Sequence, residues 1–373
     1  MKKLLSVLLV SLLLIGCSED RVLLDELTNK GSEESELMYY ESGLFNGIGY
    51  DVFSDGQLRI ERRYKNGMYD GLHKSWYENG QLSIEDNWKN GKRDGLTITK
   101  YYYENGQLWS VKESKDGKTN GVVKNWYENG QFKNESNYKN GKLDGLLKWW
   151  YENGQLYSEE KYKDGKKDGL HKSWYENGQL SIEDNWKNGK RDGLEKIWYE
   201  NGQLKSECNY KNEYEYGLHK YYEENGQLIN EKNWKDGKED GLSKEWWDNG
   251  QLINEKNWKD GKEDGLHKIW YENGQLYSEV KYKDGKEDGL YRTWYENGQL
   301  NSESKYKNGE YDGKVEKWYE NGQLQYEQNW KDGSLDGLYK QWYENGELRS
   351  ETNYKDGRII NTLSPFFTPN LTP

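Results

Sequence analysis

Trp-Tyr-Glu-Asn-Gly-Gln-Leu, residues 174–180, is the stretch that recurs with small changes along most of this 373-residue chain. Its central glycine occurs thirteen times, in steps of 24 residues except for one step of 26 between Gly80 and Gly106. The glycine positions are 56, 80, 106, 130, 154, 178, 202, 226, 250, 274, 298, 322 and 346. Self-similarity at a fixed period of this size is typical of repeat architectures, in which each unit mainly contacts its neighbours.

The copy at residues 169–192 shows what one repeat encodes. Two short runs that carry aromatic residues flank Asn177-Gly178, and an Asn-Gly pair between such runs predicts a β-hairpin with a two-residue type I′ turn. The second break, Lys187 to Gly193, has the form Lys-Asn-Gly-Lys-x-Asp-Gly and predicts a longer glycine turn. Each repeat is therefore expected to form a strand, a tight turn, a strand and a wider turn. No helical periodicity is present in the array.

A two-residue loop at Asn177-Gly178 would also set the cross-strand register. It places Tyr175 opposite Leu180, Trp174 opposite Ser181, and Lys172 opposite Glu183. Alternation then puts Tyr175, Leu180 and Trp186 on one face, and Trp174, Lys172 and Glu183 on the other. The Lys–Glu pair recurs as 74–85, 124–135, 148–159, 196–207, 244–255 and 268–279. Charge pairing and turn chemistry thus predict the same register.

Aromatic residues replace aliphatic ones as the source of buried surface. The chain is 32% hydrophobic and 15% aromatic, with 18 Trp and 33 Tyr, whereas disordered chains are poor in aromatics. We therefore predict an all-β fold: an elongated, twisted antiparallel sheet of tandem 24-residue hairpins. The aromatic rows are interpreted as the glue of the sheet, and a ligand platform is the alternative. The candidate binding residues are Trp174, Trp198, Trp246, Trp270, Trp294 and Trp318.

Charge and residue spacing exclude several classes of function. The net charge is −12, which argues against a nucleic-acid partner because such a partner requires a basic stripe. Four histidines, at 73, 171, 219 and 267, share one repeat position, and the last three are 48 residues apart. They are too far apart for one metal site, and we expect them to face solvent. We therefore predict no cofactor, no metal and no enzymatic activity, since a polar feature that is repeated does not make a single active site.

The N-terminus has the features of an exported protein. Lys2 and Lys3 precede an apolar run at 4–15, which is too short to span a membrane as a helix. The run ends in Leu14-Ile15-Gly16-Cys17, which resembles a bacterial lipobox. The resemblance implies a signal peptide at 1–16 and acylation of Cys17, which would anchor the chain in the cell envelope, at the outer membrane or the cell surface. Residues 17–38 would form a tether or a cap, residues 39–357 the array, and residues 358–373 a C-terminal tail.

The repeat unit itself resembles a known family. Asp-Gly-Leu-x-Lys-x-Trp-Tyr-Glu-Asn-Gly-Gln-Leu, followed by x-Ser-Glu-x-x-Tyr-Lys-Asp-Gly, is similar to the MORN-repeat variant (membrane occupation and recognition nexus) over residues 40–357. Bacterial proteins named as YwqK-type antitoxins carry such repeats. The resemblance implies β-hairpins in an elongated array, and interaction with a protein or a membrane in place of catalysis.

Three functions remain open from the sequence. The first is a lipid-anchored envelope scaffold that binds another, unidentified protein through a long multivalent surface. The second is a glycan or cell-wall binder that uses exposed Trp and Tyr rows. The third is an antitoxin-like partner of a toxin protein.

Overall fold

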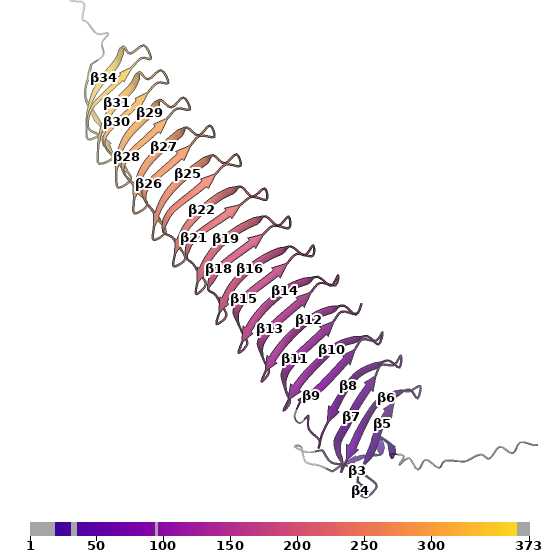
Figure 1. Ribbon diagram of the computed structural model, residues 1–373. Coiled ribbons are helices and arrows are strands. Elements are labelled where there is room, and N and C mark those ends of the chain that lie inside the picture. The colour runs from indigo at the N-terminus through magenta and orange to yellow at the C-terminus, as the bar shows by residue number, and fades with distance from the viewer. Residues whose placement is uncertain (1–18, 31–35, 94–95, 364–373) are drawn as a thin grey trace, which may run out of the picture. The chain divides into compact units, whose positions relative to one another are not determined.

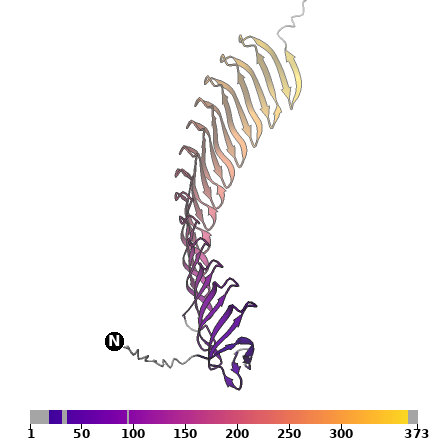
Figure 2. The same ribbon diagram turned by 90° about the vertical axis from the view of Figure 1, so that its right-hand side faces the viewer.

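The structure, a computed structural model, describes residues 19–30, 36–93 and 96–363. Two compact units divide the chain, Met1–Lys166 and Lys167–Pro373. In Figures 1 and 2, strands that follow one another in the sequence lie side by side within each unit. The predicted all-β fold of tandem hairpins is confirmed, with repeats of about 24 residues.

The first unit begins with short elements and continues as a run of hairpins. Its short elements are β1 (Arg21–Leu23), the 3-10 helix η1 (Leu24–Glu26), β2 (Thr28–Asn29), β3 (Met38–Tyr40) and β4 (Gly43–Leu44). The hairpin strands are β5 (Gly47–Val52), β6 (Leu58–Lys65), β7 (Met68–Trp76), β8 (Leu82–Trp88), β9 (Leu96–Tyr102), β10 (Leu108–Lys115), β11 (Lys118–Trp126), β12 (Phe132–Lys139), β13 (Lys142–Trp150) and β14 (Leu156–Lys163).

A small apolar cluster closes the N-terminal end of this unit. Val22, Leu27, Phe45 and Tyr64 are buried together, and β1 pairs with β5 in parallel, the one parallel pairing among the described strands. Part of the segment at 17–38 therefore continues the sheet by one strand. Burial raises the pKa of the Tyr64 hydroxyl well above its ordinary value.

The second unit repeats the hairpin without such a cluster. Its strands are β15 (Lys166–Trp174), β16 (Leu180–Lys187), β17 (Lys190–Arg191), β18 (Gly193–Trp198), β19 (Leu204–Lys211), β20 (Tyr214–Glu215), β21 (Gly217–Tyr222), β22 (Leu228–Lys235), β23 (Lys238–Glu239), β24 (Gly241–Trp246), β25 (Leu252–Lys259), β26 (Lys262–Trp270), β27 (Leu276–Lys283), β28 (Lys286–Trp294), β29 (Leu300–Lys307), β30 (Glu310–Trp318), β31 (Leu324–Lys331), β32 (Ser334–Leu335), β33 (Gly337–Trp342), β34 (Leu348–Lys355) and β35 (Arg358–Leu363). The last strand, β35, comes from the segment expected to be a tail, and it pairs with β34.

The turn at Asn177-Gly178 is not the predicted two-residue type I′ turn. Tyr175 N–H donates to Gln179 O at 2.8 Å, and Gly178 N–H donates to Tyr175 O at 2.9 Å. Gly178 has φ +84°, while Asn177 is not among the described residues with positive φ. This is a three-residue loop, a type I turn closed by a glycine in the left-handed region. The Asn177 side chain accepts from Gln179 N–H at 2.9 Å, which holds the loop without a second positive φ.

The type I′ turn occurs at the other Asn-Gly pair, where we predicted a longer loop. Lys187 pairs with Lys190, and the two residues between them, Asn188 and Gly189, have φ +52° and +82°. Asn or Asp precedes glycine in nearly every such turn, which suits a position that needs positive φ. At the copy after Gly202 the second position is Glu213, which takes φ +77° without the freedom of glycine.

A β-bulge compensates for the longer loop. Trp174 pairs with Leu180 where we predicted Ser181, and the register then shifts so that Ser173 pairs with Ile182 and Lys172 with Glu183. The predicted Lys172–Glu183 pairing is therefore confirmed, although the loop and the Trp174 partner were both wrong. Because paired residues share a face, Leu180 lies on the face of Trp174 and not on that of Trp186.

Candidate interaction surface

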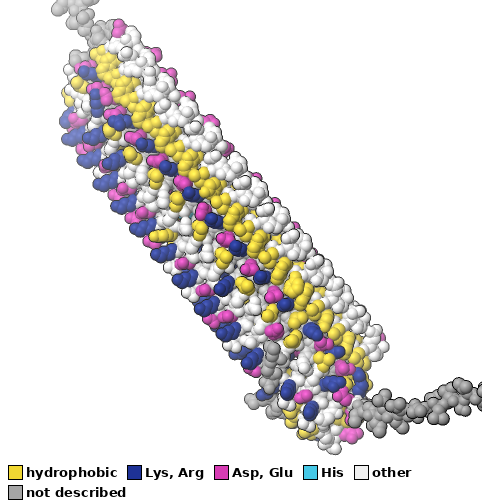
Figure 3. Space-filling model, in the orientation of Figure 1, with side chains coloured by type: hydrophobic (Ala, Val, Ile, Leu, Met, Phe, Trp, Pro, Cys, Tyr) yellow, Lys and Arg dark blue, Asp and Glu magenta, His cyan; other side chains and the backbone are white. Residues whose placement is uncertain are grey.

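One face of each unit carries a stripe of paired Trp and Leu residues, here called the Trp–Leu stripe. It consists of the last residue of one strand and the first residue of the next, on either side of the tight turn. The pairs are 52–58, 76–82, 102–108, 126–132 and 150–156 in the first unit, and 174–180, 198–204, 222–228, 246–252, 270–276, 294–300, 318–324 and 342–348 in the second. Figure 3 shows hydrophobic side chains, in yellow, gathered in a band along the strands of each unit.

Ring contacts show that neighbouring pairs of the stripe touch. The rings of Trp126 and Phe132 are 5.1 Å apart, and Phe132 is 5.3 Å from the ring of Trp150 in the next repeat. Such aromatic contacts contribute roughly 0.5–1.5 kcal/mol each beyond the burial of area. At Phe132 the neighbouring pairs of the stripe are therefore packed on each other before any partner binds.

The six candidate binding residues occupy equivalent positions in this stripe. Trp174, Trp198, Trp246, Trp270, Trp294 and Trp318 end β15, β18, β24, β26, β28 and β30, and every one is half-buried. Each indole thus packs on its neighbours and also keeps part of its surface toward solvent. The same side chains can therefore both hold the sheet together and offer a surface to a ligand.

A ladder of ion pairs runs beside the stripe on the same face. Lys172 Nζ is 2.8 Å from Glu183, and Lys148 Nζ is 2.9 Å from Glu159. The other predicted pairs, 74–85, 124–135, 196–207, 244–255 and 268–279, are also formed, at 3.2–3.7 Å. Exposed pairs of this kind contribute about 0–1 kcal/mol each, so the ladder specifies register more than it stabilises the fold.

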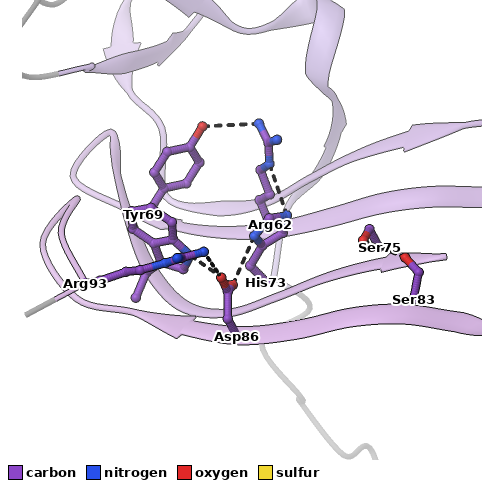
Figure 4. A network of polar contacts seen from close by, with 8 residues as sticks. Arg62, Tyr69, His73, Ser75, Ser83, Asp86 and Arg93 are labelled. Carbon is purple, nitrogen blue, oxygen red and sulfur yellow. Dashed lines mark hydrogen bonds and ion pairs between the residues drawn. The ribbon is translucent and has the colours of Figure 1, made fainter. Parts of the chain in front are cut away.

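The opposite face is crowded with small and polar side chains. Ser158, Ser206, Ser278 and Asp184 are each less than a tenth exposed. Figure 4 shows its most connected network, where Asp86 is 1% exposed and accepts from Trp88 Nε1 at 2.9 Å and from Arg93. Burial would raise the pKa of Asp86, but contacts with His73, Arg93 and Trp88 together hold it below its ordinary value.

The histidines lie on this crowded face, so the prediction that they face solvent is wrong. His219 is 1% exposed, and its Nε2 is 2.8 Å from Asn209 O. His171 Nδ1 is 2.7 Å from Asp184, and His73 lies between Asp86 and Arg62. The bulge is not the cause, because His171 pairs with Asp184, the partner that the predicted two-residue loop also gives; the histidines are covered because neighbouring side chains pack over this face. Both ring nitrogens of His73 have partners: Nδ1 is 3.1 Å from Asp86, and Nε2 accepts from Arg62 Nε at 3.4 Å. We therefore interpret this network as one that stabilises the fold.

A polar cavity of about 180 Å³ lies on the crowded face of the second unit. Lys232, Glu239, Ser243, Lys256 and Trp258 are among its lining residues. Its charges are matched internally, because Lys232 is 2.7 Å from Glu239 and Trp258 Nε1 donates to Ser243 at 2.8 Å. Across the described part of the chain, no group of three or more His, Cys, Asp or Glu residues is placed to hold a metal ion.

Two predictions about the N-terminus lie beyond the reach of the structure. Cys17 and the proposed signal peptide at 1–16 fall outside the described residues. Within the described ranges, no helix has both the length and the apolar character that a membrane span requires.

Sequence reasoning missed the leucine half of the stripe. Leucine stands two residues after the motif glycine in every copy except the one with Phe132, and its face was assigned from a predicted loop that was one residue too short. The hydroxyls of Ser173 and Ser181 are 2.9 Å apart across the bulge, but the equivalent positions of the next repeat are Ile197 and Lys205, so the residues at the bulge give no recurring signal for it.

Comparison with known proteins gives one clear match. The family model described as MORN repeat variant matches twelve segments: 69–90, 97–116, 119–140, 143–164, 167–188, 191–212, 215–236, 239–260, 263–284, 287–308, 311–332 and 335–356. They include every copy from Gly80 to Gly346. The comparison with curated proteins gave no match.

Solved structures add nothing to this assignment. A chain of the TcdB2–TccC3–Cdc42 crystal structure aligns with 87% of this chain and 23% of its own length, at 12% identity and a TM-score of 0.17. For the TcdB2–TccC3 crystal structure the values are 85%, 20%, 12% and 0.17. The present chain thus spans about a fifth of those chains, and at this TM-score the likeness supports no argument.

Proposed function

Because the chain belongs to the MORN repeat variant family, and is therefore a repeat scaffold, we propose that it is a non-catalytic scaffold that binds another protein through the Trp–Leu stripe. The observation that carries the proposal is the stripe itself. Trp and Leu are paired at equivalent positions, half-buried, and bordered by the Lys–Glu ladder. An apolar strip with a charged border is the arrangement of protein–protein interfaces, in which aromatic anchors dominate the binding energy.

The repeat makes this surface multivalent. One hairpin advances the sheet by two strand spacings, roughly 10 Å, so the same Trp–Leu pair is presented at regular intervals within each unit. A partner with a matching repeat, or a long flat surface, would engage several pairs at once and gain avidity from contacts that are weak singly.

We further propose that the chain is anchored to the cell envelope by acylation of Cys17, as its lipobox-like sequence supports. Palmitate labelling in cells, lost in Cys17→Ser, is the expected result. Labelling of neither form would remove the anchor from the proposal and leave the scaffold role untouched.

The interaction is tested by replacing stripe residues. A photo-crosslinking residue at Leu276 should capture the partner in cells, and the double variant Trp270→Ala, Trp294→Ala should weaken binding of the purified partner at least thirtyfold, a loss of about 2 kcal/mol or more. Tyr157→Ala with Tyr277→Ala removes two exposed aromatics outside the stripe and serves as the matched control. Equal losses in both variants, or capture of polysaccharide in place of protein, would contradict a protein-binding stripe.

A further inference from the structure

At the end of the hairpins that carries the type I′ turns, pairs of lysines face each other directly. In seven of the described type I′ turns, the two flanking residues are both lysine and both exposed, whereas other turns have residues such as Met68, Tyr214 or Glu310 at the second position. The facing pairs are 89–92, 115–118 and 139–142 in the first unit, and 187–190, 235–238, 259–262 and 283–286 in the second. This basic row is called the lysine edge, and in Figure 3 dark blue side chains gather along that border of the strands.

Like charges placed directly across a strand pair destabilise the hairpin. The arrangement occurs in seven described turns of a chain whose net charge is −12, so general basicity does not explain it. The nearby aspartates do not neutralise it fully. Asp264, for example, is half-buried and accepts the backbone N–H of the next turn at 3.2 Å, whereas Lys259 and Lys262 are exposed. The lysine edge is thus costly within the fold and available outside it.

The opposite edge of the same sheet carries one exposed carboxylate per repeat. Each tight turn places it two residues before the motif glycine. This carboxylate edge consists of residues 78, 104, 128 and 152 in the first unit and 176, 200, 224, 248, 272, 296, 320 and 344 in the second, all Glu except Asp248. The backbone of each is held in place, as at Glu200, whose carbonyl accepts from Asn177 Nδ2 at 3.0 Å.

The two edges therefore have opposite charge and the same spacing. The carboxylate recurs in successive hairpins, and the lysine pairs, where they occur, take the equivalent place in their own hairpins, so both follow the same spacing of roughly 10 Å per hairpin. An outside partner would need to evolve this spacing, but a second copy of the chain has it automatically. We propose that the lysine edge of one copy binds the carboxylate edge of a second copy, side by side, with each lysine pair receiving one carboxylate.

The energetics make this association cooperative and sensitive to salt. A single exposed ion pair is worth about 0–1 kcal/mol, which is too little to hold two molecules together. The free energies of several ion pairs in register add, and these ion pairs also relieve the repulsion between facing lysines. The contact joins unlike edges, so a dimer still has one free lysine edge and one free carboxylate edge, and association continues beyond a dimer. At physiological ionic strength the Debye length is near 8 Å, so the attraction acts only between edges in contact.

The test uses charge reversal and recombination in the full chain. Sedimentation velocity should show the wild type associating at 20 mM salt and dissociating at 500 mM. The triple variants Lys259→Glu, Lys262→Glu, Lys283→Glu and Glu272→Lys, Glu296→Lys, Glu320→Lys should each raise the apparent dissociation constant at least tenfold. When the two are mixed, the reversed lysine edge of one meets the reversed carboxylate edge of the other, and association should return.

A third variant separates edge contacts from net charge. Lys161→Glu, Lys281→Glu, Lys305→Glu makes the same change in charge at exposed strand positions that belong to neither edge, and should associate as the wild type does. A wild type that stays monomeric at low salt would overturn the proposal, and so would a mixture no more associated than its components. Binding of a linear polyanion by the lysine edge of a monomeric wild type would replace the second copy with that partner.

Discussion

At the scale of single residues, His219 shows how closely the crowded face encloses a side chain. It is enclosed between the rings of Tyr210 and Trp234, each 5.8 Å away, and burial lowers the pKa of its imidazole. The unfolded chain, with a His pKa near 6.5, then takes up a proton that the folded state resists. Stability is therefore complete above about pH 6.5 and falls as the pH drops below that value, with a slope that approaches 1.4 kcal/mol per pH unit.

This pH dependence is predicted to disappear in part when the imidazole is removed. His219→Phe keeps an aromatic ring between Tyr210 and Trp234 and carries no titrating group, so its urea midpoint should change less between pH 7.5 and 5.5 than that of the wild type. Tryptophan fluorescence reads the midpoint. Identical changes in the two proteins would show that other groups, such as the similarly shifted His267, account for the whole effect.

The same scale shows where prediction from sequence succeeds and fails. The 24-residue period and the Lys172–Glu183 pair could be predicted, because period and charge survive a local shift of register. The type of each turn could not, because Asn-Gly occurs at both ends of every hairpin and local sequence does not say which pair takes two positive φ values. The face of Leu180 followed from that choice. The prediction for the histidines failed for another reason, because the face that they share with Trp186 is packed with side chains and the local sequence does not show this.

At the scale of elements, each hairpin is fastened to the next by its tyrosine. The Tyr199 hydroxyl donates to Tyr222 O at 2.9 Å, and Asn201 Nδ2 donates to Glu224 O at 2.8 Å. The same tyrosine bond forms from Tyr77, Tyr103, Tyr127, Tyr175, Tyr271, Tyr295 and Tyr319. This explains why Tyr-Glu-Asn-Gly is repeated: its tyrosine and asparagine bind the following repeat, and its glycine closes the loop.

Two substitutions of opposite sign test this bond between elements. Tyr199→Phe keeps the ring and removes the hydroxyl, and should cost about 1 kcal/mol at the junction of β19, β21 and β22. Trp247 occupies the tyrosine position of its own repeat, and Trp247→Tyr should gain a similar amount by supplying the missing hydroxyl. Hydrogen exchange of the strand amides around each junction measures both changes, with the exposed Tyr157→Phe as control. Unchanged exchange in both variants would show that ring packing alone joins the hairpins.

At the scale of the whole molecule, stability is expected to depend on the number of repeats and on their phase. Leu228–Leu242 and Leu252–Leu266 are the same sequence, so deletion of residues 229–252 joins Leu228 to Ile253 without creating a new local sequence. Since each repeat contacts mainly its neighbours, the shortened chain should keep its β-sheet circular-dichroism spectrum and lose only the stability contributed by one unit and its interface.

Deletion of half a repeat makes the matched control, because it removes a strand and leaves the phase wrong. Without residues 229–240, Leu228 runs directly into Gly241, the first residue of β24, and the type I′ turn at Asp236-Gly237 is lost, so two tight turns follow each other with a single strand between them. Every Trp–Leu and Lys–Glu pair at that junction would lose its partner, so this variant should unfold at lower urea concentration than the full-repeat deletion although it lacks only half as many residues. If the two deletions were equally stable, or the longer one less so, phase would not govern the fold, and the nearest-neighbour account of the array would fail.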